Sequence, residues 1–106
     1  MTESEIVGLS PLTLRELQGM NGMRIVDCRS AGQRRRYPMP GAQPLDEIEA
    51  AAGKIASETV LIFVCQDGAW SRDAARRFAA RGFESVFVLE GGVEAWTQTE
   101  PKARAA

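Results

Sequence analysis

The segment best suited to chemistry is 65–71, Cys-Gln-Asp-Gly-Ala-Trp-Ser, which lies between an apolar run at 59–64 and a helical pattern at 72–81. If the apolar run is a strand of a parallel sheet, Cys65 lies at the carboxyl edge, where open α/β sheets bind ligands. Loop N–H groups and the dipole of the next helix then favour the reactive thiolate, and Gly68 permits the tight curve required. We expect Cys65 to be a nucleophile; the alternative is a small apolar residue ending a buried strand.

A second cysteine, Cys28, also ends an apolar stretch, at 23–28. Neither a glycine-containing loop nor a helix start of matching geometry follows it, so we expect a structural role, with a resolving thiol as the alternative. Asp27 and Arg29 flank Cys28 with opposite charges. They form either an exposed salt bridge of little energetic weight or a support for the neighbouring loop, and the sequence leaves both open.

Alternating strand and helix patterns predict how these residues are positioned. Apolar and β-branched stretches indicate strands, while helical spacing, caps such as Ser10 and glycine stops indicate helices. The predicted strands are 6–9, 23–28, 59–64 and 85–89, and the predicted helices are 11–18, 30–37, 45–55, 72–81 and a last one that carries Val93 and a core Trp96. This alternation is typical of a parallel α/β sheet with helices on both faces. We expect one domain over 1–100 and a frayed tail at 101–106.

The composition excludes several function classes. The 106 residues include no histidine, which excludes Cys–His and Ser–His catalysis and histidine-ligated metal sites, and we expect neither a metal nor a cofactor. A net charge of −1 gives no general attraction to nucleic acid or anionic lipid. The longest apolar run has six residues, whereas a membrane helix needs about 20. An acidic start without a signal-peptide pattern, and only two cysteines, predict a cytoplasmic protein with free thiols.

Four motifs in order make the chain resemble a single-domain rhodanese over nearly its whole length. They are Ile25-Val26-Asp27-Cys28-Arg29, Pro40-Gly41-Ala42, Cys65-x-x-Gly68-x-x-Ser71 and Leu89-Glu90-Gly91-Gly92-Val93-x-x-Trp96. The resemblance implies a five-stranded parallel sheet and a cysteine that carries sulfane sulfur as a persulfide. It also implies a sulfurtransferase that moves sulfur from thiosulfate or a persulfide donor to cyanide, a thiol or a protein acceptor.

Carried onto this chain, the resemblance makes Cys65 the nucleophile and its covalent persulfide the intermediate. The loop residues that would bind the donor and hold the persulfide through backbone N–H groups are Gln66, Asp67, Gly68, Ala69, Trp70, Ser71 and Arg72. Asp27 and Arg29 would support the loop. A thiolate nucleophile needs no general base, so the missing histidine is no obstacle.

The loop departs from the family in its charge. Trp70 stands where many members have a basic residue, and Asp67 adds a negative charge. We therefore expect weak use of the thiosulfate dianion unless Arg29 or Arg72 compensates. The run 34–36, three arginines, is expected to be a solvated helix face or else a surface for an anionic partner.

Two other functions compete with this interpretation. A cysteine phosphatase or arsenate reductase of related fold has a loop of the pattern Cys-x5-Arg. In this chain the sixth residue after Cys65 is Ser71, and the arginine follows one residue later, at Arg72. The second alternative is a non-catalytic rhodanese-like module for binding or regulation. The presence of both Cys65 and Gly68 argues against that alternative.

Overall fold

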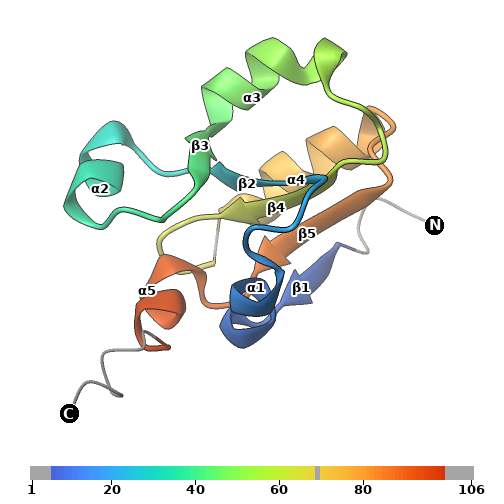
Figure 1. Ribbon diagram of the computed structural model, residues 1–106. Coiled ribbons are helices and arrows are strands. Elements are labelled where there is room, and N and C mark those ends of the chain that lie inside the picture. The colour runs from blue at the N-terminus through green and yellow to red at the C-terminus, as the bar shows by residue number, and fades with distance from the viewer. Residues whose placement is uncertain (1–5, 69, 100–106) are drawn as a thin grey trace.

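The computed structural model describes residues 6–68 and 70–99. Within them, one sheet of five parallel strands in the order β1-β5-β4-β2-β3 forms the centre of the molecule (Figure 1). The strands are β1 (Val7–Leu9), β2 (Met23–Asp27), β3 (Ala42–Pro44), β4 (Val60–Val64) and β5 (Ser85–Leu89). The helices are α1 (Pro11–Leu17), α2 (Ala31–Arg36), α3 (Leu45–Ala51), the 3₁₀ turn η1 (Ala52–Lys54), α4 (Ser71–Ala80) and α5 (Gly92–Thr97). The predicted parallel α/β class is confirmed.

Helices cover both faces of the sheet, because alternate strand residues point to opposite sides. On one face Phe63 of β4 packs with Ile48 of α3 and Phe78 of α4, and the two phenyl centroids are 5.2 Å apart. On the other face, Leu14 of α1 and Trp96 of α5 pack against the strands. Trp96 is buried, as predicted. Figure 1 shows α3 and α4 on one side of the sheet and α1 and α5 on the other.

Local sequence signals set the ends of the helices. Ser10 caps α1, because its side chain accepts an N–H from the first turn at 3.1 Å, as expected. Gly82 follows α4 with a φ of +102°, and the N–H of Phe83 reaches back to the carbonyl of Phe78. The two phenyl rings also contact each other, which completes a Schellman-type stop. These signals fix the length of α4, whose first turn follows the Cys65 loop.

One strand was not predicted from residue patterns, and several helix ends differ from the expected ones, most by one residue. β3 has three residues, includes Pro44 and pairs with β2 at the edge of the sheet, so it lacks the apolar run of an interior strand. The helix expected over 45–55 ends at Ala51 and continues as η1, and α4 begins one residue early, at Ser71. The tail expected to fray, 101–106, lies outside the described residues.

The described helices are short. The longest, α4, has ten residues, and no helix within 6–68 and 70–99 is long and apolar enough to cross a membrane. The cytoplasmic location expected from the sequence stays a prediction.

Candidate active site

Cys65 directly follows β4 at the carboxyl edge of the sheet and is 2% exposed. The chain turns back over its sulfur, and the N–H groups of Gly68 and Trp70 donate to Sγ at 3.0 and 3.4 Å. The hydroxyl oxygen of Ser71, the first residue of α4, accepts from the thiol at 3.7 Å. Two N–H groups of the expected cradle thus point at the sulfur, where they favour negative charge. Ala69 lies outside the described residues.

The first turn of α5 holds this loop in place. The N–H of Val93 donates to the carbonyl of Cys65 at 2.9 Å, and that of Glu94 donates to the carbonyl of Gln66 at 3.0 Å. Gly92 permits this approach, because its φ is +66° and a Cβ there would lie 2.5 Å from the Cys65 carbonyl oxygen. In the sequence, Gly92 belongs to a motif without an assigned role. The two adjacent glycines that follow a predicted strand were a sign of a special backbone position. The sequence could not show that they pack on the Cys65 loop, because the two segments are far apart in the chain.

A buried ion pair supports the loop from the end of β2. Nε and Nη2 of Arg29 donate to the two carboxylate oxygens of Asp27 at 3.0 and 2.9 Å, and both side chains are at most 2% exposed. The remaining guanidinium nitrogen donates to the side-chain carbonyl of Gln66 at 3.0 Å. The hypothesis of an exposed salt bridge between Asp27 and Arg29 is therefore wrong. The pair instead connects the end of β2 to the loop that follows β4.

A pocket of about 240 Å³ opens beside Cys65. Its lining comprises Cys28, Arg29, Ser30, Gln33, Cys65, Gln66, Asp67 and Trp70. Trp70 is 75% exposed and therefore forms part of the pocket mouth. Arg72 is absent from this lining among the described residues, because its guanidinium donates to the carbonyl of Ile6 at 2.7 Å. The side chain of Arg72 thus does not replace the missing basic residue at the mouth.

Cys28 lines the same pocket but has different surroundings. It is half-buried against the apolar cluster on the α3–α4 face of the sheet. Burial raises the pKa of the Cys28 thiol to about 12, and the negative charges of Cys65 and Asp27 add to this effect. Arg77 lowers the pKa, whereas Glu49 raises it. Cys28 therefore keeps its proton at neutral pH.

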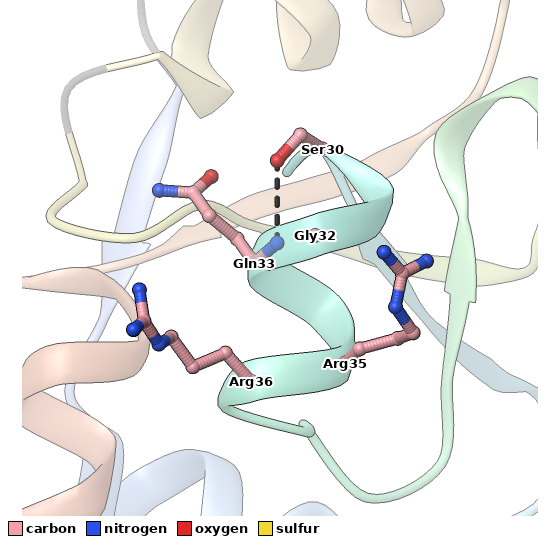
Figure 2. A pocket seen from close by; sticks show the side chains of 5 residues that line it. All are labelled: Ser30, Gly32, Gln33, Arg35 and Arg36. Carbon is pink, nitrogen blue, oxygen red and sulfur yellow. Dashed lines mark hydrogen bonds between the residues drawn. The ribbon is translucent and has the colours of Figure 1, made fainter.

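The predicted arginine run lies in α2, beside this pocket. Arg35 and Arg36 extend from the helix and, with Ser30, Gly32 and Gln33, line an open hollow on its surface (Figure 2). Ser30 caps α2 by accepting the N–H of Gln33 at 3.3 Å. None of the residues of α2 is buried, which agrees with a solvated helix face.

The sequence matches known sulfurtransferases along most of its length. The model of the rhodanese-like domain matches residues 10–99. The chain is 32% identical over 104 residues to the thiosulfate sulfurtransferase GlpE of Ectopseudomonas mendocina, covering 96% of this chain and 94% of that protein. It is 30% identical over 95 residues to the GlpE of Pseudomonas aeruginosa, covering 88% of this chain and 86% of that one.

Solved structures show the same fold. A rhodanese-like domain protein from Staphylococcus aureus has a TM-score of 0.71 and 24% identity, with coverage of 86% of this chain and 91% of that chain. A thiosulfate sulfurtransferase from Pseudomonas aeruginosa has a TM-score of 0.77 and 23% identity, with coverage of 89% of this chain and 18% of that chain. With the sheet, the Cys65 loop and the match over 10–99 taken together, the chain belongs to the rhodanese-like domain family.

Proposed function

We propose that the protein is a sulfurtransferase that carries sulfane sulfur as a persulfide on Cys65. The observation that carries this proposal is the pair of N–H donors, from Gly68 and Trp70, directed at the Cys65 sulfur. The relatives named thiosulfate sulfurtransferase, which align with nearly the whole chain, support the same class of activity.

The chemistry has two half-reactions. The Cys65 thiolate attacks the outer sulfur of the donor; with thiosulfate, the S–S bond breaks and sulfite leaves with the electron pair. A nucleophile, cyanide or a thiol, then attacks the outer sulfur of the persulfide, and the Cys65 thiolate is the leaving group. Both states of the site are anionic, so the same N–H donors stabilise both, as an oxyanion hole does.

The pocket favours a small donor of low charge. About 240 Å³ is below the usual range for drug-sized ligands and suits an inorganic sulfur anion or the end of a persulfide. Asp67 lines the pocket with a negative charge, and Trp70 adds no positive charge at the mouth. The guanidinium of Arg29 is engaged by Asp27 and Gln66. We therefore expect a high KM for thiosulfate and easier use of a less charged persulfide.

Mass spectrometry of the loaded protein tests the proposal. Incubation with thiosulfate, or separately with glutathione persulfide, should add about 32 Da, one sulfur, to the tryptic peptide 55–72 that contains Cys65. Cyanide should remove that sulfur as thiocyanate. Cys65→Ser, checked for folding by circular dichroism, should gain none. Sulfur carried by Cys28 alone, or thiocyanate formed by Cys65→Ser at the wild-type rate, would contradict the proposal.

The alternatives give different results in the same assays. A non-catalytic module would fold normally but take up no sulfur from either donor. A phosphatase would hydrolyse p-nitrophenyl phosphate in a Cys65-dependent manner. The contact of the Arg72 guanidinium with the carbonyl of Ile6 disfavours the phosphatase, because that arginine does not line the Cys65 pocket.

A further inference from the structure

Cys28 and Cys65 lie across one pocket at the ends of neighbouring strands. β2 and β4 pair in register at Asp27 and Val64, and the N–H of Cys28 donates to the carbonyl of Val64 at 2.8 Å. The pairing therefore extends one residue further and sets Cys28 opposite Cys65. Neighbouring strands are about 4.8 Å apart, and disulfides join cysteines whose Cα atoms are about 4.4–6.8 Å apart. The sheet thus holds the two cysteines at a spacing that a disulfide accepts.

We propose that Cys28 is a resolving thiol that discharges the Cys65 persulfide when no acceptor takes its sulfur, closing a Cys28–Cys65 disulfide. This inference rests on the proposed persulfide function. The Cys28 sulfur attacks Sγ of Cys65, a bond forms between them, and the bond from Sγ to the outer sulfur breaks. The outer sulfur leaves with the electron pair and takes the Cys28 proton, becoming hydrosulfide.

This step needs no outside oxidant. The sulfane sulfur is reduced to sulfide while the two cysteine sulfurs are oxidised to the disulfide, so two electrons are exchanged within the site. A dithiol reductant then restores both thiols. The result is a self-limiting carrier that releases unclaimed sulfur as sulfide and stays inactive until it is reduced.

The surroundings of Cys28 keep discharge slower than transfer to a good acceptor. The attacking species is a thiolate, and the pKa of Cys28 is raised to about 12, so little thiolate is present at neutral pH. Cys65, Asp27 and Glu49 face Cys28 with negative charge, and Arg77 faces it with positive charge. Discharge should therefore accelerate by roughly tenfold for each pH unit from neutrality towards the pKa of Cys28.

The test follows the fate of the bound sulfur without an acceptor. The reduced protein is loaded with excess thiosulfate, freed of small molecules and sampled by mass spectrometry while released sulfide is measured. The wild type should first gain about 32 Da and then settle about 2 Da below the reduced protein, with one sulfide released per chain. Trypsin should yield peptide 25–29 joined to peptide 55–72. Cys28→Ser and Cys28→Ala should hold the added sulfur at least about ten times longer.

The possible outcomes separate the two proposals. If the sulfur stays on the wild type as long as on both Cys28 variants, with no joined peptide, the resolving role is wrong and the persulfide function stands. If neither the wild type nor the variants gain sulfur from thiosulfate or, in a parallel loading, from glutathione persulfide, both proposals are wrong. The joined peptide is measured on the wild type, so the test does not depend on the variants folding.

Discussion

The ends of β2 and β4 place a cysteine at the same level of the sheet, but the two sulfurs have opposite surroundings. At Cys65 the chain curls back and the N–H groups of Gly68 and Trp70 reach the sulfur. At Cys28 the neighbours are apolar and acidic groups, and burial raises the thiol pKa to about 12. A position at a strand end therefore does not make a thiol reactive. The loop that follows sets the difference, because its N–H dipoles point at the Cys65 sulfur, where they favour negative charge.

The two strand ends are also connected to each other. Arg29, next to Cys28, binds Asp27 with two nitrogens and Gln66, next to Cys65, with the third. We therefore expect a change at the end of β2 to alter the loop after β4. The reactivity of the two cysteines should therefore be compared in the wild type and in variants that lack the Arg29 contacts.

Alkylation should give the largest difference between the two cysteines. At pH 7, iodoacetamide should modify Cys65 at least roughly tenfold faster than Cys28, because almost no Cys28 is ionised. The rate at Cys28 should rise about tenfold per pH unit towards its pKa of about 12. Peptide mass spectrometry reports each site separately. Similar alkylation rates of Cys65 and Cys28 at pH 7 would show that the loop after β4 does not make Cys65 the more reactive thiol.

Breaking the connection should cost much of the stability. Arg29→Met leaves the buried Asp27 carboxylate without its ion partner and should lower the free energy of unfolding by about 3–5 kcal/mol. It should also slow sulfur transfer, because the side chain of Gln66 loses its contact. Arg24→Met is the control, since Arg24 is exposed and its guanidinium bonds to Gln43; it should stay within about 0.5 kcal/mol. Denaturant titration measures both, and equal losses would contradict a structural ion pair.

The contact between α5 and the Cys65 loop should be sensitive to one added methyl group. Gly92→Ala places a Cβ against the Cys65 carbonyl and forces a side chain into a positive φ, which should lower unfolding free energy by about 2–3 kcal/mol. Sulfur transfer to cyanide should fall by more than roughly tenfold as the N–H donors move. Gly19→Ala is the matched control, because its φ is also positive, +85°, and no atom lies within 4 Å of its Cβ position. Wild-type transfer by Gly92→Ala would show that the loop does not depend on this contact.

Charge at the pocket mouth should have the smallest effect. Trp70→Arg adds a positive charge at the pocket mouth, where it would attract the thiosulfate dianion. It should lower KM for thiosulfate about fivefold, which corresponds to about 1 kcal/mol of binding free energy. The gain should shrink at high salt through screening. Leu12→Arg on α1 adds the same charge at another exposed apolar position and should leave KM unchanged. An unchanged KM in a folded Trp70→Arg variant would mean that Trp70 faces away from the donor.

Strong local patterns made most of the fold predictable. The apolar run that became β4 and the amphipathic stretch that became α4 are long and bounded by clear signals, so their type and place were confirmed with errors of one residue. β3 was missed because an edge strand of three residues with Pro44 carries no such pattern. Its presence depends on the hydrogen bonds that the neighbouring β2 offers.

By itself, the sequence determined the candidate loop: a buried strand ending at Cys65, a glycine at Gly68 and a helix start behind them, in a chain without histidine. Only the tertiary structure decided that Gly92 packs on that loop, that Arg29 reaches Gln66, and that Cys28 faces the same pocket. The physical reason is that a strand, turn or cap depends on neighbours within a few residues. These contacts instead depend on the strand order β1-β5-β4-β2-β3, which brings segments distant in the chain together.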